Sequence, residues 1–452
     1  MKFARNVLGI FATEVVLIGV NFLIGVLMAR TLEPTARGVL ALAMTAPFTV
    51  ANFVDPGIVQ SNIYLMGRKE RAAEAVVANA LVLAIVISTV TAFVLWLARD
   101  VILRTFLSGL TAAQFTLVLV LLPFFMLDLY MMSILRAVQC FNLYNLRRLV
   151  GQFTLLVAMF LILVVFRKAA SGAVLAFVVA SVASAILGLV LVNRVVPLRL
   201  GLHFDLLVES VRYGFKSYVQ TLVGHLNYRL HVYLLALFLD PAQVAFYVIA
   251  TNIAELGWYI PNSVGVALFP RLSATPSERV HGLTAEVCRH TIFITALATL
   301  GLATVGWVAI PLFYGPAYWP ALVPLFILLP GILSMAVYKV LTRNFSSRDR
   351  QQMSILAAVG ALVMNVGLSW VLIPRWGIGG AAVSSLISYA GASAILLLAF
   401  LRDSDLSWRD TLVIRRDDLT RYAEMFRRVW EQVSRLLAHY RTQEKVQPLG
   451  GK

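Results

Sequence analysis

Residues 75–98 read AVVANALVLAIVISTVTAFVLWLA, and no side chain in this stretch carries a charge. A helix of about 20 apolar residues crosses the ~30 Å hydrocarbon core of a bilayer, so this stretch predicts a transmembrane helix. Eleven further stretches of similar character lie at 6–29, 38–66, 111–135, 149–166, 171–193, 213–239, 243–270, 284–311, 317–342, 351–374 and 376–401. The sequence therefore predicts an all-α polytopic membrane protein with 12 transmembrane helices.

The overall composition agrees with a chain that lies mostly in lipid. Of its 452 residues, 60% are hydrophobic and 13% are charged, whereas soluble domains average roughly 45–50% and about 25%. The mean hydropathy is +0.84. Disorder and a collagen-like fibre are excluded, and two cysteines, Cys140 and Cys288, are too few for a disulfide scaffold.

The basic residues are unevenly distributed between the two sets of loops. Seventeen of them lie at the start of the chain and in the even-numbered loops, and seven lie in the odd-numbered loops. Because Lys and Arg accumulate in cytoplasmic loops, both termini are expected in the cytoplasm. This distribution accounts for the net charge of +16, so no nucleic-acid partner is expected. Both cysteines fall near the reducing side, which argues against a disulfide.

The chain repeats itself at an offset of 207 residues. Leu32-Glu33-Pro34 returns as Leu239-Asp240-Pro241, and Leu121-Leu122-Pro123 returns as Leu328-Leu329-Pro330. The first span then corresponds to the seventh and is expected to be retained rather than cleaved. Six spans per copy give both copies the same orientation. We expect an N-terminal six-helix lobe at 1–207, a C-terminal six-helix lobe at 208–401 and a basic cytoplasmic tail at 402–452, with a central cavity between the lobes.

Ionisable residues mark the helices that avoid lipid. Each costs roughly 2.5–3.5 kcal/mol at the centre of a lipid-facing helix, so it is expected to face protein or water. They fall in spans 1, 2 and 4 and in the corresponding spans 7, 8 and 10, where most helix-breaking prolines also lie. The candidate substrate-binding residues are Glu14, Asp55, Asp128, His225, Arg229 and Glu255.

Each candidate also has a structural explanation. Asp55 precedes Pro56-Gly57 and could cap a helix break, and Asp128 could pair with Arg136. The other four could form salt bridges that hold the lobes together.

The functional explanation starts from the spacing of His225 and Arg229. They share a helix face at i,i+4, which favours an anionic ligand because guanidinium binds phosphate with two hydrogen bonds. Glu14 and Glu255 could bind a coupling H⁺ or Na⁺, or neutralise Arg229.

The sequence lacks several common catalytic and nucleotide-binding motifs. There is no Walker A loop, no H-E-x-x-H, no C-x-x-C and no G-x-S-x-G, so we expect no enzyme, no resident cofactor and no metal. The triplet Asp403-Ser404-Asp405 is a weak match to a transferase metal pair.

The tail contains one apolar helix stripe, formed by Leu419, Tyr422, Phe426, Val429, Val433, Leu436 and Tyr440. The stripe predicts an amphipathic helix on the membrane surface, or one docked on a partner or on the protein's own loops.

Short motifs in both halves, such as Ala29-Arg30-Thr31-Leu32-Glu33-Pro34 followed by Gly38 and Asp55-Pro56-Gly57, resemble those of Wzx-type polysaccharide flippases. The second half carries Asn227-Tyr228-Arg229, Leu268-Phe269-Pro270-Arg271 and Ile373-Pro374-Arg375-Trp376-Gly377-Ile378-Gly379-Gly380-Ala381. The resemblance covers residues 5–400 and implies membership of the multidrug/oligosaccharidyl-lipid/polysaccharide exporter (MOP) superfamily, with the lipid II flippase MurJ and the MATE antiporters as relatives.

The resemblance implies translocation of undecaprenyl-pyrophosphate-linked oligosaccharide from the cytoplasmic to the periplasmic leaflet of a bacterial inner membrane by alternating access. It also implies a role in lipopolysaccharide or exopolysaccharide assembly, with Arg229 facing the pyrophosphate. Two departures, His231 where many relatives have an acid and Glu33 in place of a glycine, leave the coupling ion open. The alternatives are a MATE-like antiporter of organic cations, a membrane-embedded glycan polymerase or glycosyltransferase, and a scaffold for other polysaccharide-assembly proteins.

Overall fold

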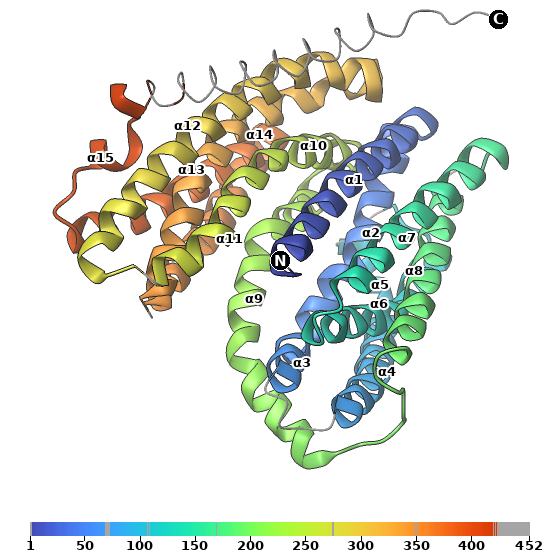
Figure 1. Cartoon of the computed structure of the whole chain (residues 1–452). Coiled ribbons are helices and arrows are strands. Elements are labelled where there is room, and N and C mark those ends of the chain that lie inside the picture. The colour runs from blue at the N-terminus through green and yellow to red at the C-terminus, as the bar shows by residue number, and fades with distance from the viewer. Residues whose placement is uncertain are drawn as a thin grey trace, which may run out of the picture.

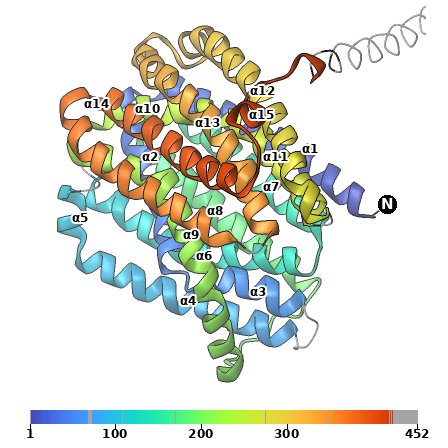
Figure 2. The ribbon, with the colours of Figure 1, turned by 90° about the vertical axis from the view of Figure 1, so that its left-hand side faces the viewer.

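The computed structural model describes residues 2–67, 73–105, 107, 109–168, 170–273, 275–348, 350–418, 420 and 422. Helices and short connections make up this part of the chain, which contains no β-strand (Figures 1 and 2). Figure 1 shows α9 in the middle of the molecule, with α12–α14 to one side and α4, α6, α7 and α8 to the other. The prediction of an all-α polytopic membrane protein is confirmed.

The first eight helices form the N-terminal half: α1 (Lys2–Thr31), α2 (Pro34–Val54), α3 (Ile58–Gly67), α4 (Ala73–Leu97), α5 (Arg99–Thr105), α6 (Ala112–Ala137), α7 (Phe141–Phe160), continued by the π-helical η1 (Leu161–Val165), and α8 (Ala170–Asn193). The C-terminal half comprises α9 (Phe204–Phe238), α10 (Pro241–Ala254), η2 (Glu255–Trp258), α11 (Tyr259–Ser273), α12 (Ser277–Ala309), η3 (Ile310–Tyr314), η4 (Pro316–Ala321), α13 (Leu322–Ser347), α14 (Gln351–Asp403) and α15 (Trp408–Leu412).

Two of the predicted spans are broken helices. The span at 38–66 is divided into α2 and α3 by Asp55-Pro56-Gly57, because proline donates no backbone hydrogen bond and Gly57 adopts φ +90°. The span at 243–270 is divided into α10 and α11 by the tight turn η2, which begins at Glu255. Both breaks leave polar residues at the middle of a long apolar segment.

Helix α14 is a hairpin of two antiparallel helices. The chain reverses at Gly377, whose φ of 56° and ψ of −135° are not helical. Gly360 faces Ile395 and Gly391 faces Met364, so the two arms pack side by side through small residues. The turn at Gly377 falls at the second residue of the span predicted at 376–401, just after the span predicted at 351–374.

In the described part of the chain, nine helices are long and apolar enough to cross a membrane. The count of twelve crossings and the division into two lobes therefore stay predictions. Several helices begin before the spans drawn from hydropathy, whose ends are approximate: α7 begins at Phe141 rather than 149, and α9 begins at Phe204 rather than 213. As a result Arg147 and Arg148, counted as loop residues, lie inside α7.

The chain after α14 folds back onto α12. Asp418 accepts hydrogen bonds from Arg289 at 2.6 and 3.2 Å, and both side chains are buried. The Arg289 guanidinium holds the pKa of Asp418 at about 2. Apart from Tyr422, the apolar stripe predicted at 419–440 lies outside the described residues.

The two halves meet closely at two points. Helices α2 and α10 pack against each other at Gly38 and Pro241, and α3 packs against α9 at Gly57 and Gly214. At both points a Cβ atom would overlap the backbone of the opposite half. Small residues let membrane helices approach in this way, where hydrophobic burial alone gives no preference for protein over lipid. One continuous apolar cluster runs from α1 and α2 into α10 and α13.

We expect Gly38→Ala to destabilise the protein, because the added methyl group would collide with the Pro241 carbonyl. Overpacking of this kind costs about 1–3 kcal/mol, which should appear as a lower midpoint of thermal unfolding in detergent. The control is Gly282→Ala in α12, where no atom lies within 4 Å of the added carbon. Equal midpoints for the two variants would show that the close approach at Gly38 is unimportant.

Candidate functional site

The predicted site residue Glu14 lies on α1 and is bound by Arg148 of α7. Arg148 donates from Nη1 to Oε1 at 2.6 Å and from Nη2 to Oε2 at 3.1 Å, a bidentate ion pair. The ring of Tyr144, one turn earlier on α7, lies 5.5 Å from the Arg148 guanidinium carbon. The side chains of Glu14 and Arg148 are 32% and 23% exposed, so the pair is open to solvent or ligand from one side.

The predicted site residue Glu255 lies across the interface, in the break between α10 and α11. Tyr259, one turn later, lies within electrostatic reach of Glu14, Arg148 and Glu255. Lys339 of α13 also interacts electrostatically with Glu255. We call Glu14, Arg148, Glu255, Tyr259 and Lys339 the interface cluster. It brings together side chains of both halves, including two of the six predicted site residues.

Polar and aromatic groups from the C-terminal half extend the interface cluster. The Lys339 ammonium donates to Asn262 Oδ1 at 2.9 Å and lies 4.9 Å from the centre of the Trp258 ring. Tyr259 and Asn262 are exposed. Together with Tyr144, these residues offer two cations, several hydrogen-bonding groups and aromatic faces within one region between the halves.

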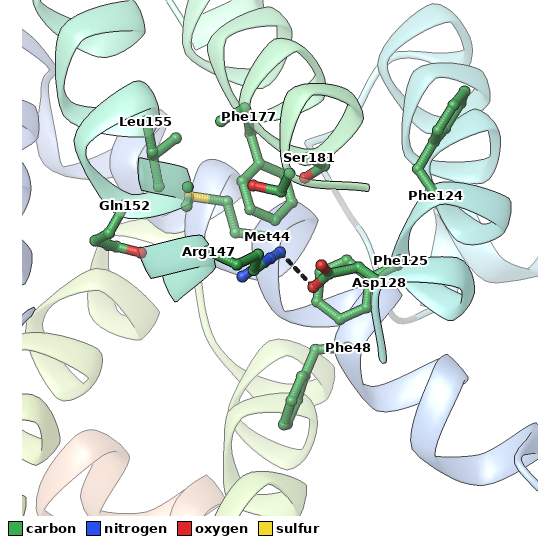
Figure 3. Close-up of a pocket in the computed structure, with 13 residues that line it drawn as sticks. Met44, Phe48, Phe124, Phe125, Asp128, Arg147, Gln152, Leu155, Phe177 and Ser181 are labelled. Carbon is green, nitrogen blue, oxygen red and sulfur yellow. Dashed lines mark ion pairs between the residues drawn. The ribbon is translucent and has the colours of Figure 1, made fainter. Parts of the chain in front are cut away.

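The predicted site residue Asp128 lies in a separate cavity of the N-terminal half. It forms an ion pair with Arg147 of α7 rather than with Arg136, the partner considered from the sequence (Figure 3). The cavity is about 340 Å³ and is lined by residues of α2, α6, α7 and α8: Met44, Phe48, Phe124, Phe125, Asp128, Arg147, Gly151, Gln152, Leu155, Phe177, Ala180, Ser181 and Ser184. Figure 3 shows the ion pair among Phe48, Phe125 and Phe177, so aromatic rings surround one pair of charges in the cavity.

Asp55 is buried just before α3, and its carboxylate has a structural role. Its Oδ1 accepts hydrogen bonds from the Ile58 amide at 2.9 Å and from the Tyr130 hydroxyl at 3.0 Å. The carboxylate therefore caps the helix break, as the structural explanation of this residue predicts. It contributes to neither the interface cluster nor the cavity.

The predicted site residues His225 and Arg229 lie on α9. Their side chains are outside the described residues, so their role stays a prediction. In the described part of the chain, no three His, Cys, Asp or Glu side chains come together as a metal site would require.

Sequence reasoning missed Arg147 and Arg148 as site residues. Both were assigned to a cytoplasmic loop because they adjoin Arg136 and precede the apolar run that starts at Leu149. The available signal was their position directly before an apolar run, because a helix that begins earlier than the run includes both arginines. Two adjacent arginines point to different sides of a helix, which lets one reach α1 and the other α6.

We expect the Glu14–Arg148 pair to show energetic coupling. Either Glu14→Gln or Arg148→Gln leaves a half-buried charge without its partner, at a cost of about 1–2 kcal/mol, between the values for exposed and buried pairs. The double variant should lose less than the sum of the two single losses. Unfolding in detergent measures all four proteins, and strictly additive losses would mean that the pair contributes nothing.

A family model described as "Polysaccharide biosynthesis protein" matches residues 3–275, more than half of the chain. Among curated proteins, the probable low-salt glycan biosynthesis flippase Agl15 of Haloferax volcanii is 21% identical over 182 residues, 39% of each chain. Protein DETOXIFICATION 8 of Arabidopsis thaliana is 40% identical over 81 residues, 18% of this chain and 16% of that protein. The matches thus span well under two thirds of these two relatives.

Solved structures show the same fold over most of the chain. The lipid II flippase MurJ, in an inward closed conformation, has a TM-score of 0.74 at 13% identity, covering 88% of this chain and 87% of that one. An inward-facing MATE family multidrug resistance transporter of the MOP superfamily has a TM-score of 0.72 at 15% identity, covering 85% and 93%. An outward-facing structure of this kind scores 0.60.

These relatives are flippases and transporters rather than enzymes, in agreement with the expectation from the sequence. The resemblance to the MOP superfamily is confirmed in the fold. The chain therefore belongs to the polysaccharide biosynthesis protein family.

Proposed function

We propose that this protein is a flippase that moves an undecaprenyl-pyrophosphate-linked oligosaccharide from the cytoplasmic to the periplasmic leaflet of a bacterial inner membrane by alternating access. The observation that carries the proposal is the interface cluster, in which a guanidinium of one half and an ammonium of the other lie among polar groups of both halves. A pyrophosphate head group requires such cations. The prenyl chain would remain in lipid.

Glu14 acts in this proposal as a placeholder for the head group. A carboxylate and a phosphate present similar pairs of oxygens to the fork of a guanidinium, so a phosphate can take the position that Glu14 holds on Arg148. The exposed Tyr259 and Asn262 then lie beside the head group, where their polar groups can bind sugar hydroxyls. Release of the anion returns Arg148 to Glu14.

The driving ion is part of the proposal. A proton or Na⁺ at Glu14 would weaken its hold on Arg148, and Glu255 offers a second carboxylate within the same cluster. Ion binding and head-group binding would thereby act on the same guanidinium. Both termini would face the cytoplasm, as the loop charges predict.

A MATE-like exporter of organic cations is the second candidate. The aromatic cavity around Asp128 favours it, because aromatic faces and a carboxylate suit such cations. However, Arg147 occupies that carboxylate, so a cationic ligand would first have to displace a guanidinium. At the interface cluster, by contrast, the paired guanidinium of Arg148 is partly exposed, so another anion can exchange with Glu14, which favours an anionic substrate.

Deletion of the gene should leave the lipid-linked oligosaccharide in the cytoplasmic leaflet while its synthesis continues. The measurement is the accessibility of the glycan to a lectin or a glycosidase in right-side-out vesicles. Failure to make or extend the glycan would instead indicate an enzyme. Normal sidedness, combined with loss of resistance to organic cations, would favour the antiporter.

A charge swap separates a substrate role of Arg148 from a structural one. The double variant Glu14→Arg/Arg148→Glu retains an ion pair but moves the cation from α7 to α1. We expect it to fold at normal abundance and to lose at least tenfold in export, because the head group no longer meets a cation at the same place. Normal export would mean that the pair merely holds α1 against α7. Arg199→Ala, at an exposed pair with Glu74, is the control.

Arg229→Ala should also abolish export without lowering the amount of protein in the membrane, because the resemblance to Wzx-type flippases places this arginine opposite the pyrophosphate. Export is measured by the same assay of glycan sidedness. Export at the normal rate would remove Arg229 from the mechanism and leave Arg148 as the main cation.

A further inference from the structure

Arg37 is a buried cation at the end of the interface farthest from the interface cluster along α1 and α2. It lies in the first turn of α2 and is 5% exposed. Its guanidinium carbon lies 5.0 Å from the ring centre of Tyr314 and 5.1 Å from that of Tyr318. Tyr314 ends η3 and Tyr318 lies in η4, so both rings belong to the opposite half.

The surroundings of Arg37 are uncharged. Within the described part of the chain it forms no ion pair, and its hydrogen-bond partners are the hydroxyls of Tyr314 and Tyr318. Its Nη1 atom has no hydrogen-bond partner there. Burying a cation without a carboxylate is costly, and the two ring faces offset only part of that cost. Arg37 therefore stays buried only while both rings stay in place.

Further contacts at this end also join the two halves. Arg30 donates to the carbonyl oxygens of Leu312 and of Phe313, the latter at 2.8 Å. The Tyr318 hydroxyl donates to the Leu32 carbonyl at 3.1 Å. These contacts tie the end of α1 to η3 and η4, next to the close packing of Gly38 on Pro241.

A glycine joins the two segments that carry the tyrosines, η3 and η4. Gly315, between them, has φ +103°, a conformation that favours glycine, and its added Cβ would meet no atom within 4 Å. The two rings also contact each other, with centroids 6.5 Å apart, so we expect η3 and η4 to move together.

We propose that Arg37, Tyr314 and Tyr318 form a reversible gate that closes this end of the interface between the halves. With the gate closed, the rings hold the cation between them. When η3 and η4 withdraw, the guanidinium regains water, so hydration favours opening while ring contact favours closure. The gate rests on the proposed alternating access. Arg37 favours its open state through hydration, and Tyr314 and Tyr318 favour its closed state through ring contact.

Cysteine labelling tests the gate without measuring transport. Cys140 and Cys288 are replaced by alanine, and Leu42→Cys supplies the reporter, since Leu42 is buried one turn after Gly38 on the same face of α2. The probe is a water-soluble maleimide on the full chain in lipid nanodiscs. Tyr314→Leu and Tyr318→Leu should each raise the labelling rate about tenfold, which corresponds to ~1.4 kcal/mol.

Arg37→Met should act in the opposite direction. A methionine fits between aromatic rings and carries no charge to hydrate, so this variant should label at or below the rate of the unmodified gate. Arg37→Met combined with Tyr314→Leu should label more slowly than Tyr314→Leu alone. Trp319→Leu is the matched control, because this exposed η4 ring packs on Trp307 and not on Arg37.

A second reporter separates gate opening from unfolding. Ser263→Cys lies one turn after Tyr259 on α11 and is exposed. Opening at Arg37 should slow its labelling if the halves rock, whereas unfolding would speed labelling at both sites. The gate is wrong if the tyrosine variants leave Leu42→Cys labelling unchanged, if they speed labelling at both sites, or if Arg37→Met speeds labelling. Each result stands whether or not the protein moves a glycolipid.

Discussion

Helices in a bilayer gain little from covering one another's apolar surfaces, because lipid covers those surfaces equally well. The two halves of this protein must therefore be held by close packing and by a few polar contacts. Gly38 on Pro241 and Gly57 on Gly214 supply the packing. Such contacts are strong when complete and are lost after a small separation, since dispersion falls steeply with distance. An interface of this kind suits two bodies that must part and rejoin.

The charged residues follow from the same constraint. Glu14 and Asp128 are tolerated at membrane depth because adjacent arginines of α7 neutralise them, and Asp55 is tolerated because a helix break supplies donors. The three carboxylates differ in solvent exposure and in the groups that surround them. Asp55 is buried and satisfied, Asp128 lies in an aromatic cavity, and Glu14 remains partly open beside groups from the other half.

The helical membrane fold could be predicted because span length and hydropathy are local properties of the chain. The partner of each carboxylate could not be predicted in the same way, since pairing depends on which helices are neighbours. Arg147 and Arg148 illustrate the difficulty, because a span drawn from hydropathy alone excludes the charged first turns of a helix that an ion pair makes acceptable. The capping role of Asp55 could be predicted, because the tripeptide Asp-Pro-Gly favours a turn whatever its neighbours in the fold are. Arg37 was counted as a loop charge, and its burial depends on two tyrosines 277 and 281 positions away in the sequence.

The two ends of the interface use different partners for arginine, and the difference has a physical reason. A carboxylate on Arg37 would form a fully buried ion pair, and separating such a pair leaves two charges to be rehydrated or re-paired, with losses of about 3–5 kcal/mol when one partner is missing. Tyrosine rings hold the same cation with a smaller energy and remain uncharged when it leaves. At the interface cluster the opposite arrangement is suitable, because a phosphate can replace the carboxylate on Arg148 and leave the guanidinium paired throughout. A neutral partner where the halves must separate means that no carboxylate is left behind when Arg37 returns to water. An exchangeable anion where we propose that the head group binds keeps Arg148 paired throughout.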